Sequence, residues 1–147
     1  MATWTADNFT QIPHNGAYGN KSVAVGAYAN LALATAAAGD LFDFVKLPAG
    51  ATVLSGFIFS TQMTGTSTWA IGVRYADGTS TGGTTGTNVL VSGTSSLISA
   101  LGSTALRFTP FTNDADTIVY ATHVGGPVHT ANDNATQVLD YVATGTK

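Results

Sequence analysis

The chain has 147 residues, of which 44% are hydrophobic and only 9% are charged, and its formal net charge is −3. This length predicts one domain with a core of its own, and the high apolar content excludes a disordered chain. The five basic residues are scattered, which excludes the clustered positive charge of a nucleic-acid-binding surface, and the absence of cysteine excludes disulfides and thiolate metal sites.

Composition also favours strands. All eight acidic residues are aspartate, and threonine, serine, alanine and glycine take the place of the glutamate and lysine that cover exposed helices. The low charge fits extensive contact with partner subunits, because charged residues are depleted at the centre of interfaces. A general bias toward small polar residues is the alternative. The sequence contains neither a secretory signal nor an apolar run of ~20 residues that could span a bilayer, so we expect a soluble protein made in a cytoplasm.

Residues 1–21 are expected to form an irregular N-terminal arm, followed by a single domain over residues 22–147. Trp4 and Phe9 are the apolar residues of this arm, and Pro13–Gly16 has the composition of a turn. Two interpretations are open: the arm is flexible, or it docks on a neighbouring subunit that buries its aromatic rings.

The first half of the predicted domain contains four candidate strands. Residues 22–28 are the first, and residues 31–38 are favoured as a strand over a helical turn because the segment is short for a helix. Strands over 39–47 and 51–59 are joined by the corner Pro48–Gly50. Proline cannot donate to a sheet and glycine tolerates positive φ, so the chain is expected to turn there.

Residues 67–75 alternate large apolar with small or polar side chains, which predicts a strand with one face on the core and an Asp-Gly turn at 77–78. Residues 79–87 contain no apolar residue and predict an exposed loop. A short strand over 88–91 and a polar link over 92–103 follow.

The last predicted strands are 105–111, 116–124 and 137–143, with a Gly-Gly-Pro turn after the second of them. About eight strands without a long helix predict an all-β protein, an antiparallel two-sheet sandwich that is best described as a jelly roll. An immunoglobulin-like sandwich is the alternative, although its cysteine and tryptophan markers are missing.

Candidate sites for chemistry are few. His14, His123 and His129 lack the short paired spacing of zinc ligands and are expected at the surface or at strand ends. The segments 113–116 and 132–134 are rich in Asp and Asn but lack the calcium-loop signature, so structural turns are expected.

Asp40 and Asp43 are three residues apart on a predicted strand and should point to opposite faces, which argues against a paired acid–base site. Asp43 is instead expected to pair with Lys46 or with a neighbouring subunit. The tryptophans and tyrosines could stack on a sugar, but core or interface packing is the preferred interpretation. We therefore expect no catalytic residues, no metal and no cofactor.

The segment 39–56 resembles the front half of the small decoration proteins (cement or head-stabilising proteins) of tailed bacteriophages. The resemblance is carried by a Gly-Asp strand that leads to the Lys-Leu-Pro-Ala-Gly-Ala corner at 46–51, and by a strand that ends in the Asp-Gly turn at 77–78. The Asp-rich turn at 113–116 and the terminal strand at 137–143 complete the pattern.

This resemblance implies a non-enzymatic virion protein that decorates the outer surface of an icosahedral head and bridges neighbouring major capsid subunits. It also implies a homo-oligomer, as a trimer or alternatively a dimer, and it involves neither nucleic acid nor membrane. Trp4, Phe9, Asp43 and Lys46 are the expected contacts with the capsid or with other copies. The alternative is a tail or fibre jelly roll that binds carbohydrate or a receptor through its tryptophan and tyrosine side chains.

Overall fold

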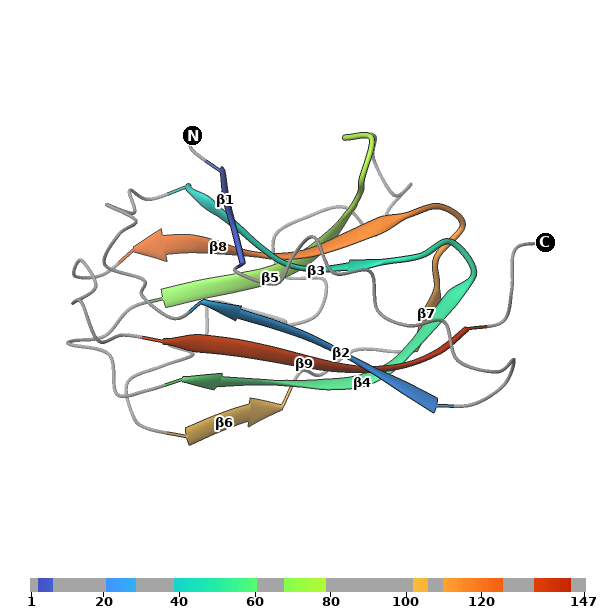
Figure 1. The fold of residues 1–147 in the computed structure, drawn as a ribbon. Coiled ribbons are helices and arrows are strands. Elements are labelled where there is room, and N and C mark those ends of the chain that lie inside the picture. The colour runs from blue at the N-terminus through green and yellow to red at the C-terminus, as the bar shows by residue number, and fades with distance from the viewer. Residues whose placement is uncertain are drawn as a thin grey trace.

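A computed structural model describes residues 3–6, 21–28, 39–60, 68–78, 102–105, 110–125 and 134–143. These residues form nine strands, arranged as two sheets that face each other (Figure 1). The strands are β1 (Thr3–Thr5), β2 (Lys21–Tyr28), β3 (Leu41–Leu47), β4 (Ala51–Ser60), β5 (Thr68–Tyr75), β6 (Gly102–Ala105), β7 (Phe111–Thr112), β8 (Thr117–Gly125) and β9 (Ala135–Ala143). Within these ranges there is no helix long and apolar enough to cross a membrane.

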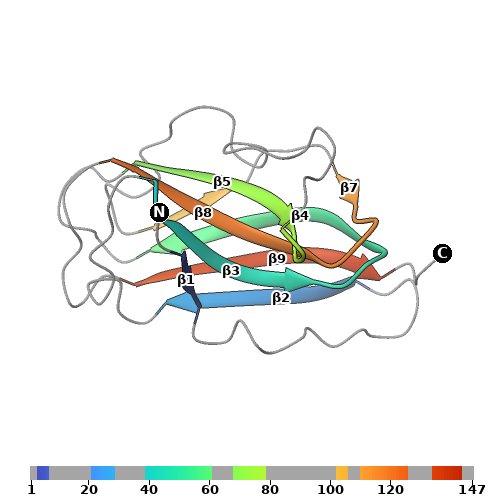
Figure 2. The ribbon, with the colours of Figure 1, turned by 90° about the horizontal axis from the view of Figure 1, so that it is seen from above.

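The strand order is that of a jelly roll. One sheet has the order β1-β3-β8-β5, and the other has the order β2-β9-β4-β6, with β7 also paired to β4. Consecutive strands alternate between the sheets, except β6 and β7, which both pair with β4. The antiparallel pairs β2–β9, β3–β8 and β4–β6 place early strands beside late ones. Figure 2 shows the two sheets stacked on each other. The predicted all-β, two-sheet sandwich is therefore confirmed.

The core lies between the sheets, because the side chains of each strand alternate between an inner and an outer face. The alternation is regular in β9, where every second residue from Ala135 to Ala143 is buried. The large inward side chains, all fully buried, are Phe42, Leu47, Ile71 and Val119 from the first sheet and Val53, Leu139 and Tyr141 from the second.

A β-bulge changes the side-chain alternation in β3 and another does so in β4, and these two strands lie in different sheets. In β3 the register shifts between Asp43 and Val45, so that Phe44 and Val45 are both buried in the core. In β4 it shifts between Val53 and Ser55, with Leu54 as the extra, exposed residue. A bulge moves the following residues to the opposite face, so each strand has buried apolar residues on both sides of the shift, such as Val53 and Ile58 in β4.

The bulge in β3 lies against β2 of the other sheet. A Cβ atom added to Gly26 would lie 2.1 Å from the carbonyl oxygen of Phe44, so only glycine allows the two strands to approach this closely. Next to this point the Tyr28 hydroxyl donates to the Asp43 carbonyl at 3.1 Å. The Tyr28 ring also packs edge-on against Phe44, with centroids 4.9 Å apart, which holds β2 of one sheet against β3 of the other.

The corner between β3 and β4 forms as predicted. Gly50 has a φ of 77°, and the Ala51 N–H donates to the Pro48 carbonyl at 3.3 Å. The adjacent corner residue, Ala49, donates its N–H to Asp116 Oδ1 at 3.1 Å, so the Asp-rich turn before β8 holds this corner in place.

The N-terminal segment differs from its prediction. Residues 3–5 are not irregular but form β1, which pairs in parallel with β3, and the Ala6 N–H extends the pairing to the Asp43 carbonyl at 2.9 Å. The reason is that the backbone of β3 would otherwise present an unpaired sheet edge. Three residues are too few to show a strand period in the sequence.

Other differences concern the middle of the chain. Residues 102–103 belong to β6 although they were predicted as a link, and the predicted strand 105–111 is described only at Ala105 in β6 and at 110–111, where β7 begins. The strands predicted at 31–38 and 88–91 and the loop at 79–87 lie outside the described residues.

Candidate interaction surface

The outer face of the five-stranded sheet carries the large apolar side chains that the fold leaves exposed. Their exposed fractions are 54% for Val23, 45% for Val25, 39% for Leu54, 42% for Phe57 and 43% for Phe59. We call these five side chains the apolar face. Most apolar residues of a folded chain that are exposed occur singly, whereas a contiguous group marks an interaction site.

Strand register makes the apolar face continuous. Val25 of β2 lies opposite Val138 of β9, and Val138 lies opposite Phe57 of β4, so three apolar side chains form one row across the sheet. The neighbouring row contains Phe59, whose ring centroid is 6.3 Å from that of Phe57. Outward residues on adjacent strands are close enough to pack side by side, so the row is one surface.

The bulge in β4 widens this surface. Leu54 and Ser55 both point outward, because Val53 before them and Gly56 after them are buried. Without the bulge, one of the two residues would point into the core. The bulge in β4 therefore keeps buried residues on the inner face and also adds Leu54 to the apolar face.

Charge is confined to one end of the apolar face. Lys21 Nζ lies 2.9 Å from Asp140 Oδ2, and the Ser55 hydroxyl donates to the same oxygen at 2.7 Å. The hydrogen bond from Lys21 holds the pKa of Asp140 below its usual value. Val23 lies opposite Asp140, so this ion pair borders the apolar rows and can fix the orientation of a partner.

The chemistry available to this face is contact rather than catalysis. Fully burying a valine, leucine or phenylalanine side chain stabilises by roughly 1.5–3 kcal/mol, and these side chains are already about half covered. A partner that covers all five therefore gains about 1 kcal/mol from each of them, before the entropic cost of association.

The described contact residues that were predicted from the sequence do not lie on the apolar face. Trp4 lies in β1 at the edge of the other sheet, where it pairs with Phe42, and Phe9 lies outside the described residues. Lys46 has a half-buried side chain on β3 that is paired with Asp116, Nζ to Oδ2 3.2 Å. None of these described positions adjoins the apolar face, which belongs to the opposite sheet.

The predicted ion pair between Asp43 and Lys46 is wrong. Asp43 is buried and accepts a hydrogen bond from Arg74 Nη2, in an ion pair that reaches across β8 from β5. The Arg74 guanidinium also lies 5.9 Å from the centre of the Tyr120 ring. Arginine is long enough to span the intervening strand, and burial raises the pKa of Asp43 although Arg74 lowers it.

The segment 113–116 is a structural turn, as predicted. Asp116 accepts from the Ala49 N–H and pairs with Lys46, so its carboxylate is used in holding the corner. Among the described residues there is no group of three or more His, Asp or Glu side chains that could hold a metal ion. The segment 132–134 is described only at Asn134.

His123 fits the strand-end alternative of its prediction and not the surface alternative. It lies toward the end of β8 but is buried, with its ring 5.3 Å from the Trp69 ring, so it is a core histidine and not a surface one. His14 and His129 lie outside the described residues. The packing interpretation of the aromatic residues is confirmed for the buried side chains of Trp69, Tyr28, Tyr120 and Tyr141.

The apolar face was not predicted from the sequence. The signal was present in Phe57-Ile58-Phe59, where apolar residues occupy both faces of one strand, and in the valines at 23 and 25. Apolar residues on both faces predict a strand that is covered on both sides. Only the structure shows that, among the described residues, these side chains on the outer side of the sheet are 39–54% exposed.

The fold occurs in three solved bacteriophage capsids. A chain of the capsid of Ralstonia phage GP4 matches with a TM-score of 0.75 and 19% identity, over 99% of this chain and 100% of that chain. A chain of the acidic stable capsid of Helicobacter pylori bacteriophage KHP30 matches with a TM-score of 0.57 and 17% identity, over 88% and 92%. A chain of the cyanophage Pam1 capsid asymmetric unit matches with a TM-score of 0.50 and 23% identity, over 88% and 89%.

No protein-family model matches the chain, and no curated protein sequence does. At these identities the structural likeness establishes the fold, and what the chain does is a separate inference.

Proposed function

We propose that this chain is a non-enzymatic structural protein of a phage virion, which decorates the outside of an icosahedral head and cements neighbouring major capsid subunits. The observation that carries the proposal is the end-to-end match with a chain of the Ralstonia phage GP4 capsid, which leaves almost no part of either chain unmatched. The resemblance of residues 39–56 to decoration proteins points in the same direction.

The apolar face gives this function a physical basis. In the proposed contact, Val25, Phe57 and Phe59 pack on the capsid surface, and the Lys21–Asp140 pair lies at the rim, where charged residues set orientation more than affinity. A stable contact of standard size buries about 800 Å² on each partner, so the apolar face would be its centre and polar neighbours its rim.

Cementing requires more than one contact. We infer that the chain acts as a homo-oligomer, a trimer or a dimer, so that each copy holds a different capsid subunit and modest contacts add up through avidity. Trp4 and Phe9 of the N-terminal segment, with Lys46 at the corner, are the proposed second contact. Asp43 belongs to this set only through its backbone or its partner Arg74, because its carboxylate is buried and paired.

The proposal is tested by cryo-electron microscopy of particles assembled in cells that express the chain with its neighbouring genes. Density for the chain outside the shell, touching more than one capsid subunit, is the expected result. A bare shell, or density only at the tail, would contradict it and favour a tail or fibre module.

The contact face is tested with Phe57→Asp, which puts a charge at the centre of the apolar face. Ala76→Asp is the matched control, since it adds the same charge at a partly exposed position in the turn after β5, outside the apolar face. Occupancy of the particle sites should fall for the first variant and stay near the wild-type level for the second. Equal occupancy for both would exclude the apolar face as the contact.

A further inference from the structure

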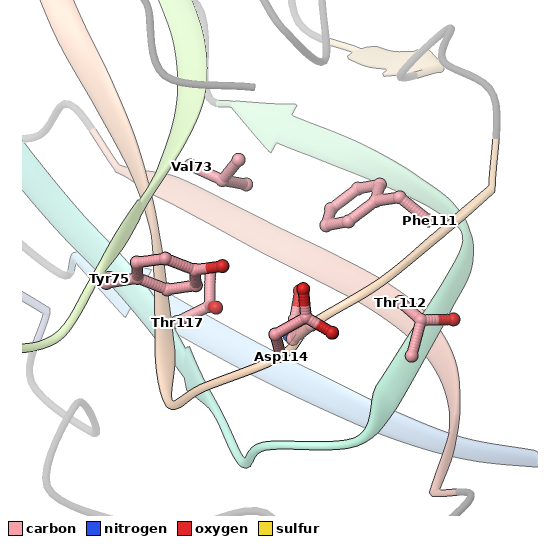
Figure 3. Close-up of a pocket in the computed structure, with 7 residues that line it drawn as sticks. Val73, Tyr75, Phe111, Thr112, Asp114 and Thr117 are labelled. Carbon is pink, nitrogen blue, oxygen red and sulfur yellow. The ribbon is translucent and has the colours of Figure 1, made fainter. Parts of the chain in front are cut away.

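A pocket of about 220 Å³ lies at the end of the sandwich where β5 ends and β7 leads into β8. It is lined by Val73, Tyr75, Phe111, Thr112, Asn113, Asp114 and Thr117, which come from both sheets and from the Asp-rich turn. Figure 3 shows the rings of Tyr75 and Phe111 on opposite sides of the pocket, with Asp114 between them. The apolar face and the proposed contacts do not include any of these residues.

The wall of the pocket is held by hydrogen bonds rather than formed by a loose loop. The Thr112 and Thr52 hydroxyl groups are hydrogen-bonded at 2.8 Å. The Asn113 N–H donates to the Ala51 carbonyl at 2.9 Å, and the Gly50 N–H donates to the Asn113 carbonyl at 2.8 Å. A pocket fixed in this way does not have to be ordered by its ligand, which lowers the cost of binding.

One polar group of the pocket has no hydrogen-bond partner among the described residues. Asn113 is only 4% exposed, and its side-chain Nδ2 is buried without a hydrogen-bond acceptor. An unpaired buried donor costs about 1–3 kcal/mol, so an occupant whose carbonyl oxygen reaches this amide would stabilise the bound state.

The other lining residues and the volume indicate the remaining chemistry and the size of the occupant. Val73, Tyr75 and Phe111 offer apolar contact, while Asp114 is exposed and adds a negative charge at the pocket. A volume of 220 Å³ is larger than the ~150 Å³ that holds benzene and smaller than the ~300 Å³ at which pockets for drug-sized ligands begin. The pocket therefore fits one aliphatic or aromatic side chain.

We propose that this pocket binds a single large apolar side chain from an extended, basic segment of a partner subunit in the particle. The backbone carbonyl beside that side chain accepts the hydrogen bond of Asn113, and a neighbouring lysine or arginine lies against Asp114. Interfaces commonly depend on such an anchor in a well-packed pocket. The partner in this inference rests on the proposed function, whereas the ligand chemistry follows from the pocket alone.

The ligand chemistry is tested on the isotope-labelled chain by NMR at low ionic strength, with N-acetyl-lysyl-leucine methylamide as the probe. Saturable shifts of the Asn113 side-chain amide are expected. N-acetyl-aspartyl-leucine methylamide should bind about two- to fivefold more weakly, the effect of one exposed charge pair. A titration that does not saturate up to the solubility limit, or one that leaves Asn113 unaffected, would overturn the proposal.

The role of the pocket in the particle is tested with Asp114→Trp, which places a large ring at the pocket, and with Asp77→Trp as the matched control. Asp77 is also exposed, but it lies in the turn after β5 and does not line the pocket. Circular dichroism establishes that both variants fold. The first variant should lose the peptide shift and part of its particle occupancy, and the second should keep both.

The outcomes separate this proposal from the proposed function. If Asp114→Trp loses the peptide but fills the particle sites like the wild type, the pocket is not a particle contact and only this inference fails. If the wild-type chain binds no particle while the peptide still shifts Asn113, the proposed function fails and the ligand chemistry of the pocket stands.

Discussion

Replacing Gly26 by alanine is expected to destabilise the fold strongly, because β2 passes β3 there without space for a side chain. The added Cβ would lie 2.1 Å from the carbonyl oxygen of Phe44, 2.5 Å from its carbonyl carbon and 3.0 Å from its Cα. All three are backbone atoms of the bulge, so no change of rotamer can relieve the clash. The two strands, and with them the edges of both sheets, must move apart.

The magnitude follows from the size of that movement. Separation by about 1 Å is needed before the closest contact becomes acceptable, and overpacking of this kind costs about 1–3 kcal/mol, or more where the backbone itself must shift. The lower entropy of the unfolded alanine variant offsets about 0.4–1 kcal/mol of this. We expect a net loss of about 3 kcal/mol, which lowers Tm by roughly 6–12 °C in a domain of this size.

Thermal unfolding by calorimetry, with urea titration as a second measurement, gives both quantities. Gly78→Ala is the control, since no atom lies within 4 Å of its added Cβ and the cost comes only from its φ of +85°. That strain is worth about 1–2 kcal/mol. If Gly26→Ala unfolds at the wild-type temperature, or no lower than Gly78→Ala, the close approach of β2 to Phe44 is refuted.

Three further substitutions test the polar groups of the fold. Gln137 is fully buried, and neither polar atom of its amide has a hydrogen-bond partner in the part of the chain that the structure describes. Gln137→Met should therefore raise the free energy of unfolding by about 1–3 kcal/mol in urea titrations, and a loss would contradict this. Burial raises the pKa of Asp43 above 3.8, so the stability that this group contributes is complete below pH 3.8 and is lost as pH rises through the folded-state pKa. Asp43→Asn should therefore gain stability relative to the wild type between pH 3 and pH 7. Asp140 has a pKa lowered by Lys21, so its contribution is present above pH 3.8 and is lost as pH falls, and Asp140→Asn should cost more at pH 7 than at pH 3. If the stability difference from the wild type changes with pH in the same way for both variants, the pKa directions of Asp43 and Asp140 are both refuted.

The regular strands could be predicted because one side of each faces the core. Segments 22–28, 67–75 and 137–143 alternate in sequence and are strands at almost those positions. The jelly-roll architecture then follows from the number of strands and from the requirement that both sheets bury one face. For one of these three segments, 67–75, the prediction of a single buried face is wrong, since Ala70 on its other face is buried as well.

The bulges could not be predicted, and they decide where the polar residues lie. In a regular strand Asp43 and Lys46 would point to opposite faces, but the extra residue Phe44 puts both on the outer face. Their partners are then set by neighbours that are distant in sequence: Arg74 comes from two strands away, and Asp116 comes from the turn that meets the corner. Local patterns carry no signal for such contacts.

The Asp-rich turn at 113–116 was predicted, but its part in forming the pocket was not. The composition of 113–116 indicated a turn, and Asp116 confirms it by holding the corner. The pocket beside Asn113 depends on β5 and β7 lying across from the turn, which is a property of the assembled sandwich. The same holds for the apolar face, because no local pattern shows whether a sheet is covered by the rest of its own chain.

The two outer faces of the sandwich differ, and this difference constrains how the chain can assemble. On the first sheet Ala70, Ile118 and Tyr120 are buried within the chain, whereas on the second sheet Val25 and Phe57 are exposed. A net charge of only −3 gives little repulsion against self-association, so an uncovered apolar face promotes contact with other copies. Copies that bind one another through this face cannot bind a capsid through it. Free oligomers built on the apolar face would therefore have to dissociate before attachment, whereas oligomers built on another surface would attach intact.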